Sequence, residues 1–428
     1  MTTLFHADIL LDDYTVLKGG YLGVRDDTIS YIGQAKPAEA YDSVRTLQNH
    51  LLIPGLYNLH THSPMTLLRG VGSDLPLDRW LHEAIFPVEA KLTDEDISVG
   101  ARLAMLELLA SGVVSFTDMY DNMHAIAHEV AAAGMKANLG RPAAILPGES
   151  PTEGDSRLQI ATDFYKDWHN KENGRILVDF SIHAEYTITP ELARKCGEVC
   201  KSHNAIMHLH LSETVKEHEG CKERRGGMTP TQWFDSLGVF ENPTVAAHCV
   251  AVEPGDMDIM HAKGVTAVHN PTSNMKLASG FMPMADMLGR GMKLAIGTDG
   301  AASNNNLNLF EEMHLASIIH KGHTGDPTVL SPTQLLTMAT VAGAETQGRK
   351  QCGALAVGNK ADIVALSLDK PHLMPVHDVP ALLVYAAQGS DVALTMVDGK
   401  VLYENGVYHT IDVDKVRYDL EKSITRLI

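Results

Sequence analysis

Short runs of apolar residues alternate with segments of helical period through the middle of the chain, between Leu52 and Gly297. Continuous apolar runs are typical of strands that are buried on both faces, as in parallel sheets. The pattern predicts eight such strands, at residues 52–58, 113–118, 136–141, 177–183, 205–211, 244–248, 265–269 and 293–297. The helices predicted between them include Asp94–Ala110 and Glu191–His203, the second with Thr189 as N-cap.

Eight β/α alternations indicate an α/β protein with a closed, parallel (β/α)8 barrel of the TIM type. A doubly wound open sheet is the alternative from the pattern alone. It is disfavoured because no Gly-rich phosphate turn opens a helix in the sequence.

Both ends of the chain have a different pattern, in which short strands are joined by turns. These strands lie between Phe5 and Gly33 and between Lys360 and Tyr403, where Asp398-Gly399 is a hairpin signal. Neither end is long enough to form a sheet with its own core, so we expect them to pair in one small β-sandwich domain. The predicted domains are 1–54 plus 358–428 for the sandwich and 55–357 for the barrel.

The composition of the chain indicates which kinds of partner it can bind and in which cellular compartment we expect it. A chain of 428 residues with 44% hydrophobic content can bury a large core, and a net charge of −18 argues against binding nucleic acid. The five cysteines have no regular spacing, which is typical of reduced thiols. The sequence has neither a secretory pattern nor an apolar stretch long enough for a membrane span, so we expect a cytoplasmic protein that does not bind membranes.

One connection is unusually long for a compact domain. It runs from His62 to Lys91 before the next clear helix. Long connections of this kind tend to be functional, and we expect this one to act as a lid over a pocket.

Histidines and an aspartate follow several predicted barrel strands, where barrel enzymes place catalytic groups. His60 and His62 follow the first strand, and they share a face because side chains alternate along a strand. His210 ends the fifth strand, His248 the sixth, and Asp299 follows the eighth. Imidazole and carboxylate groups at one rim favour a divalent ion, with zinc first and iron or manganese next.

A further histidine of the fifth strand and a serine mechanism are both left out of this predicted site. His208 shares the face of His210 one layer deeper, and we interpret it as barrel filling. Catalysis by a Ser-His-Asp triad is disfavoured because the sequence has no GxSxG motif.

An ordered set of motifs extends over essentially the whole chain: IPGLYNLHTH, LLRGVGSDLPLDRWL, HLHLSET, AAHC, VHNPTSNMKLASG and GTDGAASNN. It resembles the amidohydrolase superfamily, and within it the methylthioadenosine/S-adenosylhomocysteine deaminases and their chlorohydrolase relatives. The sequence departs from many of those relatives at Asn306 and Asn308, where they often have acidic residues.

The resemblance implies a role for each matching residue. It implies one divalent ion per subunit with the metal ligands His60, His62, His210 and Asp299, and it implies Glu213, His248 and Asp299 as catalytic residues. Substrate contacts are implied for Glu213 and for Trp80, Glu89, His183, Arg141 and Arg157. In this scheme Glu213 shuttles protons, and the two arginines meet an amino-acid carboxylate on a larger substrate.

The implied activity is hydrolytic deamination of an adenosine-type nucleoside by a metal-activated hydroxide. Candidate substrates are 5′-methylthioadenosine, S-adenosylhomocysteine, adenosine and 5′-deoxyadenosine. Alternatives are a deaminase or chlorohydrolase for another heteroaromatic ring (guanine, a pterin or a triazine) and a non-catalytic scaffold of the same fold. The resemblance also implies a homo-oligomer, either a dimer or a tetramer.

Overall fold

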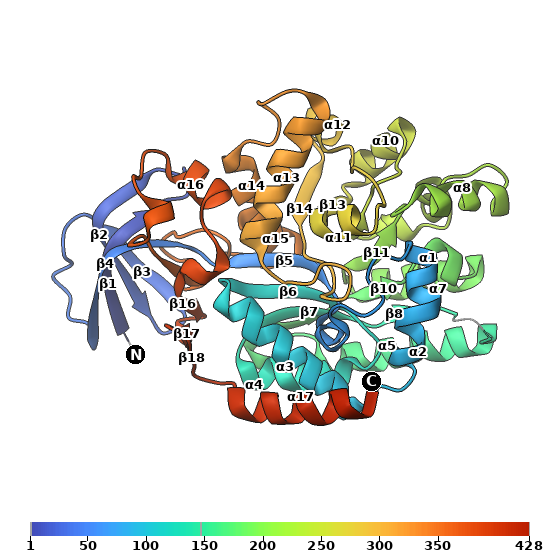
Figure 1. Cartoon of the computed structure of the whole chain (residues 1–428), viewed down its shortest axis with the longest axis horizontal. Coiled ribbons are helices and arrows are strands. Elements are labelled where there is room, and N and C mark those ends of the chain that lie inside the picture. The colour runs from blue at the N-terminus through green and yellow to red at the C-terminus, as the bar shows by residue number, and fades with distance from the viewer. Residues whose placement is uncertain (1, 146–147, 428) are drawn as a thin grey trace.

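Eight strand positions form a parallel barrel at the middle of the molecule, as the apolar pattern predicts (Figure 1). The computed structural model describes residues 2–145 and 148–427. The barrel strands are β5 (Leu56–Thr61), β6 (Val113–Met119), β7 (Lys136–Gly140) with β8 (Pro142–Ala143), β9 (Ile176–Val178) with β10 (Phe180–Ile182), β11 (Met207–Leu211), β12 (Thr244–His248), β13 (Thr266–His269) and β14 (Lys293–Ile296). The third and fourth positions are each split, because β7 pairs with β9 whereas β8 pairs with β10.

The first and last barrel strands are joined by side chains as well as by backbone. The Asp299 amide donates a hydrogen bond to the His60 carbonyl at 2.9 Å. Asn58 and Thr298 exchange two hydrogen bonds, of 2.7 and 3.0 Å, so the ring is closed beside the histidines.

The predicted first strand, 52–58, was placed too early. Residues up to Pro54 belong to β4 (Ser43–Pro54) of the terminal sheet, and β5 begins at Leu56. Only Gly55 separates the two strands, and a Cβ at this position would lie 2.3 Å from a methyl group of Val114. A single apolar run therefore contains two strands of different sheets.

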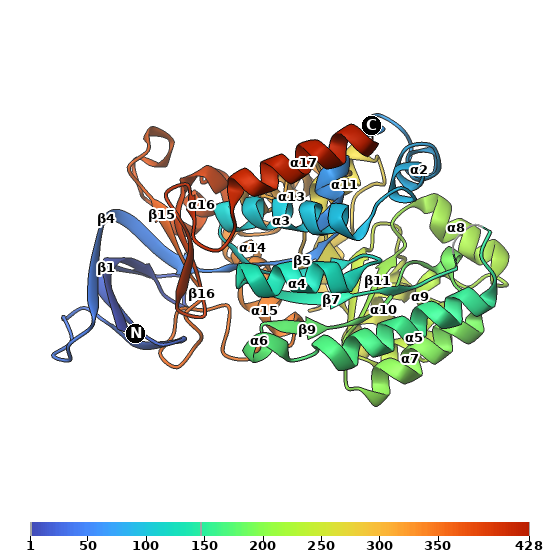
Figure 2. The ribbon, with the colours of Figure 1, turned by 90° about the horizontal axis from the view of Figure 1, so that it is seen from below.

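Helices cover the outside of the barrel (Figures 1 and 2). Both named helix predictions are confirmed, as α3 (Asp94–Ala110) and α7 (Pro190–Ser202), and Thr189 accepts a hydrogen bond from the Leu192 amide. The others in this region are α4 (Met123–Ala133), α5 (Pro151–Trp168), α6 (Lys171–Gly174), α8 (Val215–Arg224), α9 (Pro230–Ser236), α10 (Pro254–Lys263), α11 (Pro271–Lys276), α12 (Met284–Gly289), α13 (Leu309–Thr324), α14 (Pro332–Ala339) and α15 (Val341–Thr346). None of the helices within the described residues is long and apolar enough to span a membrane.

The connection predicted as a long loop consists largely of short helical turns. They are the 3-10 helix η1 (Ser63–Leu68), α1 (Leu77–Arg79), the π-helix η2 (Trp80–Ile85) and α2 (Phe86–Glu89). Apolar side chains of these turns pack together around Met65, Leu68 and Trp80. The segment therefore packs in a small core that also includes Ala302, and its action as a lid stays a prediction.

Strands from the two ends of the chain join in one eight-stranded sheet, in the order β18-β17-β16-β15-β4-β1-β2-β3. The new strands are β1 (Thr2–Leu10), β2 (Val16–Arg25), β3 (Thr28–Gly33), β15 (Ile363–Ser367), β16 (Val392–Val397), β17 (Lys400–Glu404) and β18 (Val407–Tyr408). Strand β4 connects the ends, since it pairs with β1 on one side and with β15 on the other. The sheet folds over a core that includes Phe5, Ile29 and Met396, so the predicted sandwich is one continuous, folded sheet.

The predicted hairpin at Asp398-Gly399 is confirmed, and both residues have positive φ, of 45° and 75°. Two helices follow strands of the C-terminal segment, α16 (Val379–Tyr385) and α17 (Val413–Leu427). Figure 2 shows α17 lying along α3 of the barrel, where Arg102 and Asp419 form an ion pair at 3.0 Å. The C-terminal segment thus contributes to the barrel's outer layer, and the domain limits 1–54 plus 358–428 and 55–357 stay a prediction.

A buried ion cluster connects the barrel to the terminal sheet. Lys136 Nζ of β7 lies 2.5 Å from Asp362 and 2.7 Å from Asp398, both of which come from the terminal sheet's C-terminal part. The Tyr57 hydroxyl also donates to Asp362, at 2.8 Å. The Lys136 side chain is only 4% exposed, so one ammonium compensates two carboxylates away from bulk water.

We expect Lys136→Met to lower the free energy of unfolding by about 3–5 kcal/mol, because it leaves buried carboxylates without their cation. Urea unfolding followed by circular dichroism measures this loss. Lys166→Met is the matched control, since Lys166 forms only an exposed ion pair with Asp163. Equal midpoints for the two variants would contradict a structural role of the buried cluster.

Candidate metal centre and active site

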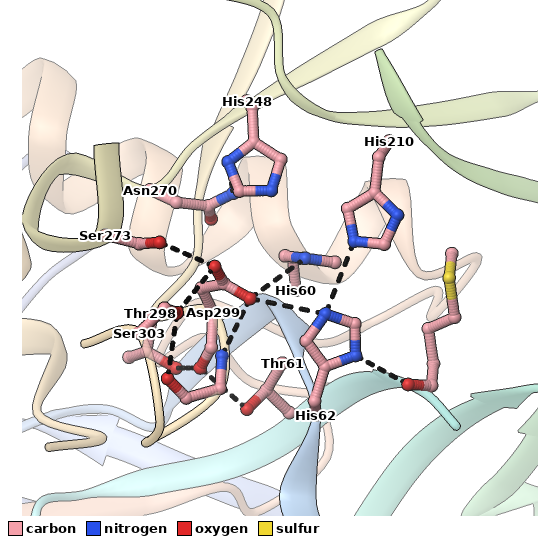
Figure 3. Close-up of polar contacts among 12 residues, drawn as sticks. His60, Thr61, His62, His210, His248, Asn270, Ser273, Thr298, Asp299 and Ser303 are labelled. Carbon is pink, nitrogen blue, oxygen red and sulfur yellow. Dashed lines mark hydrogen bonds and ion pairs between the residues drawn. The ribbon is translucent and has the colours of Figure 1, made fainter. Parts of the chain in front are cut away.

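Four predicted ligands from three barrel strands meet at one point (Figure 3). His60 lies in β5 and His62 directly after it, His210 lies in β11, and Asp299 follows β14. Asp299 Oδ1 is 3.4 Å from His60 Nε2 and 3.3 Å from His62 Nε2, and His62 Nε2 is 3.3 Å from His210 Nε2. Two atoms that each lie about 2.1 Å from one tetrahedral zinc ion are about 3.4 Å apart, so these spacings fit a shared ion.

The outer ring nitrogens are held by the protein, which leaves the inner ones facing one another. His62 Nδ1 donates to the Met119 carbonyl at 2.6 Å, and His210 Nδ1 donates to the His183 carbonyl at 2.8 Å. Both Nε2 atoms therefore present lone pairs across 3.3 Å unless a proton or a cation lies between them. His60 Nε2 is buried and has no hydrogen-bond partner among the residues that the structure describes.

The electrostatics of the cluster also favour a cation. Burial lowers the pKa of His60 to about 3, so this ring is neutral at pH 7 and can act as a ligand. Burial acts in the same direction on His62, but contact with the Asp299 carboxylate outweighs it and raises the pKa of His62 to about 9. A positive charge is thus stabilised at this point, and a metal ion takes the place of such a proton when it binds. The residues present fit a divalent metal ion.

Asp299 is held rigidly on the strand end. Its Oδ2 accepts hydrogen bonds from Ser273 at 2.6 Å and Ser303 at 2.8 Å, and its Oδ1 accepts one from the Gly300 amide at 2.8 Å (Figure 3). Asp299 and His248 both have positive φ, of 62° and 72°, which non-glycine residues rarely adopt. Such strained backbone is concentrated at functional sites.

His248 and Glu213, the other predicted catalytic residues, border the same cluster. His248 ends β12, and one of its ring nitrogens lies within 4.8 Å of ring nitrogens of His60 and His210. Glu213 follows β11, is 8% exposed, and its backbone amide donates to Glu217 at 2.8 Å. Burial raises the pKa of the Glu213 carboxyl, which is the direction that makes a carboxylate a better proton acceptor.

A cleft of about 830 Å³ opens in front of the cluster, and every predicted substrate residue lines it. Its wall includes His62, His210, Glu213, His248 and Asp299 beside Trp80, Glu89, His183, Arg141 and Arg157. This volume is within the usual range for sites that bind small molecules.

The predicted nucleoside-binding residues differ in how freely they face the cleft. Trp80 is only 5% exposed, and its indole nitrogen donates to the Val71 carbonyl at 3.2 Å, so it packs in the 63–90 segment as well as lining the cleft. Glu89 accepts a hydrogen bond of 2.6 Å from the Tyr120 hydroxyl, and burial raises the pKa of its carboxyl. His183 Nδ1 lies 3.3 Å from the Thr187 hydroxyl.

The two predicted arginines lie together at one end of the cleft, but acidic residues already contact them. Arg157 Nη1 donates to Asp121 Oδ1 at 2.6 Å, and Arg157 Nη2 donates to Glu149 at 2.7 Å. Arg141 Nη2 forms a longer ion pair with the same Asp121 oxygen, at 3.4 Å. The sequence interpretation did not include Asp121 or Glu149.

Several residues that support the centre were also missed. His208 was interpreted as filling, and it does lie inside the barrel, yet its Nε2 is 2.9 Å from His60 Nδ1 and thus holds the outer nitrogen of a ligand. Asn274 holds His248 in the same way, at 2.9 Å. Both of these residues, as well as Ser273 and Ser303, lie within the motifs quoted above, so position in a motif was the available signal.

Removing the partner of a metal ligand should weaken metal binding without removing a ligand. We expect His208→Phe to lower zinc affinity about 10- to 100-fold, because the orientation of His60 is no longer fixed. Competition for zinc with a chromogenic chelator measures this. His320→Phe is the control, since His320 is also buried but bonds His269 rather than the cluster. If both variants keep the affinity of the unmodified protein, His208 is only filler.

An α/β barrel with imidazoles and a carboxylate converging at the carboxyl ends of its strands defines the class of metal-dependent barrel hydrolases. Comparison with known families agrees, because the model of the amidohydrolase family matches residues 51–402. The chain belongs to the amidohydrolase family and is a metal-dependent hydrolase.

Relatives and solved structures match nearly the whole chain. A 5-methylthioadenosine/S-adenosylhomocysteine deaminase from Acetivibrio thermocellus is 42% identical over 99% of this chain and 98% of the relative. A 5′-deoxyadenosine deaminase from Methanosarcina mazei is 41% identical over 99% of both chains. The crystal structure of an adenosine deaminase from Xanthomonas campestris with bound zinc has a TM-score of 0.93 and 30% identity, and it covers 99% of this chain and 98% of its own.

Proposed function

We propose that this protein deaminates an adenosine-type nucleoside by hydrolysis, releasing ammonia and the inosine analogue. The candidate substrates are 5′-methylthioadenosine, S-adenosylhomocysteine, adenosine and 5′-deoxyadenosine. The proposal rests mainly on one observation: in the cleft, Glu213 and His248 border the cluster of predicted metal ligands, which are His60, His62, His210 and Asp299. Relatives more than 40% identical over the whole chain have adenosine-type deaminase names, which supports the same reaction here.

One divalent ion per subunit would be held by His60, His62, His210 and Asp299, and we propose zinc, with iron or manganese as alternatives. Three imidazoles and one carboxylate form a ligand set typical of zinc. When bound, such an ion acidifies water and so supplies a nucleophile at neutral pH. Bound zinc in the Xanthomonas campestris deaminase supports this choice.

The substrate would lie in the cleft with its base toward the cluster. In this arrangement Trp80 forms a wall for the nucleoside, and Glu89 accepts hydrogen bonds from the ribose hydroxyls. The Glu89 carboxylate already accepts from Tyr120, which fixes its orientation. His183 contributes a further polar contact, and Arg141 and Arg157 are the groups that a substrate carboxylate would reach.

Deamination adds the elements of water at C6 of adenine and expels ammonia, so a proton must reach N1 and later the leaving nitrogen. Glu213 is proposed to carry it, because it is buried in the cleft and its pKa is raised. The hydrogen bond from its own amide to Glu217 holds its backbone in place. His248, held by Asn274, is proposed to donate to or orient the incoming oxygen, and Asp299 is proposed to orient it as well.

A panel of substrates tests the proposal. The purified protein is incubated with the four adenosine-type nucleosides and with guanine, a pterin and a triazine, while the ultraviolet spectrum and ammonia are followed. Rapid, chelator-sensitive ammonia release from an adenosine-type nucleoside supports the proposal. Activity confined to guanine, a pterin or a triazine would replace it with the alternative heteroaromatic reaction, and a metal-free inert protein would indicate a scaffold.

Two properties outside the site stay predictions. We propose a homo-oligomer, either a dimer or a tetramer, which light scattering of the purified protein measures. A cytoplasmic location is likewise proposed, and fractionation of the source cells measures it.

A further inference from the structure

The arginine end of the cleft carries an acidic residue that no substrate assignment explains. Asp121 follows β6 and its carboxylate faces both arginines: Oδ1 lies 2.6 Å from Arg157 Nη1 and 3.4 Å from Arg141 Nη2. Asp121 lines the cleft together with these arginines, and its side chain is 48% exposed. One carboxylate oxygen of the protein thus lies between the two cationic groups.

Acidic residues of the chain already engage three of the five N–H donors of Arg157. Glu149 accepts from its Nε at 3.3 Å and from its Nη2 at 2.7 Å, and Asp121 accepts from its Nη1. Glu149 is not among the residues that line the cleft, so it holds the guanidinium from the side, whereas Asp121 meets it inside the cleft. A carboxylate that enters must displace Asp121 or lie against it, and like charges at such distances repel.

Arg141 gives the complementary observation. Its longer contact with Asp121 leaves its guanidinium only partly engaged, and its buried Nε has no hydrogen-bond partner among the described residues. The site therefore has the groups for a carboxylate, but an aspartate of the chain itself occupies the place between them. The two positive charges of Arg141 and Arg157 are balanced by the two negative charges of Asp121 and Glu149.

We infer that Asp121 sets substrate specificity: it occupies the carboxylate position between Arg141 and Arg157 and selects nucleosides whose 5′-substituent is uncharged. This inference rests on the proposed function, which it narrows. Methylthioadenosine and 5′-deoxyadenosine leave the Asp121–arginine contacts intact, whereas the amino-acid end of S-adenosylhomocysteine must break them. We expect attraction between Asp121 and the substrate ammonium to be weaker than this competition, because Asp121 Oδ1 already forms ion pairs with both guanidinium groups.

Asp121→Asn tests the inference, because the amide has the same size and no negative charge. We expect the unmodified protein to have a kcat/KM for methylthioadenosine roughly 100-fold higher than for S-adenosylhomocysteine, and Asp121→Asn to reduce that ratio at least about 10-fold. The ratio should fall because kcat/KM for S-adenosylhomocysteine rises. This rise should disappear in the Asp121→Asn/Arg157→Ala double variant. Thermal melting checks that each variant is folded.

Asp155→Asn is the matched control. Asp155 lies on α5, the helix of Arg157, is 52% exposed, and pairs with Lys195 rather than with either arginine. The Asp155→Asn substitution removes one negative charge at a similarly exposed position. The ratio of kcat/KM for the two nucleosides should therefore not change. An equal change in this control would mean that net charge, rather than the Asp121 position, is responsible.

Equilibrium binding of both nucleosides, measured by calorimetry, separates this inference from the proposed reaction. If neither nucleoside is deaminated, the proposed function fails, and the binding ratio still decides the role of Asp121. Equal preference for the two nucleosides in the unmodified protein would overturn the inference. So would a loss of S-adenosylhomocysteine binding in Asp121→Asn, since Asp121 would then bind the substrate ammonium.

Discussion

His60→Ala will remove nearly all metal and activity: we expect below about 0.1 zinc per chain and a kcat reduced roughly 10⁴-fold or more. His60 is fully buried, and its ring contacts Asp299 on one side and His208 on the other. Its loss therefore removes one of four ligands and one of the two imidazoles that contact the Asp299 carboxylate. Metal analysis after gel filtration and ammonia release measure the two effects.

Chelation tests the same dependence without altering the core. Dialysis against a strong chelator should abolish ammonia release, and adding zinc, iron or manganese singly should rank the ions by the activity that each restores. His323→Ala is the control variant, because His323 is an exposed histidine on α13 that stacks on Phe281 away from the cluster. Full activity of a metal-free protein would exclude the proposed mechanism.

The barrel and its ligand set could be predicted because both depend on local sequence. Strands buried on both faces require apolar runs, and alternation along β5 places His60 and His62 on one side. The carboxyl ends of parallel strands meet at one rim, so strand positions alone bring His210 and Asp299 near them. The error at 52–58 arose because β4 continues into β5 with only Gly55 between them.

The supporting contacts could not be predicted, since they depend on distances across the barrel. Whether His208 fills space or holds His60 is decided by a 2.9 Å contact between strands 148 residues apart. The pairing of Arg157 with Asp121 joins a strand end to a helix 36 residues later. The 63–90 segment was also interpreted from its length alone, whereas the packing of Met65, Leu68 and Trp80 orders it in short turns.

Glu213→Gln should separate catalysis from metal binding, because Glu213 borders the cluster without being one of the four ligands. We expect kcat to fall about 10²- to 10⁴-fold, since the amide cannot collect a proton for N1 or deliver it to the leaving ammonia. Zinc content and thermal stability should stay unchanged, because the Glu213 backbone amide still donates to Glu217. Glu219→Gln, an exposed change on α8, is the control and should keep full turnover.

The glutamine keeps the shape of the Glu213 side chain. A rise in KM with an unchanged kcat would therefore assign Glu213 to substrate binding. Near-normal ammonia release would place the proton transfer on another group in the cleft, such as His248 beside the ligand cluster.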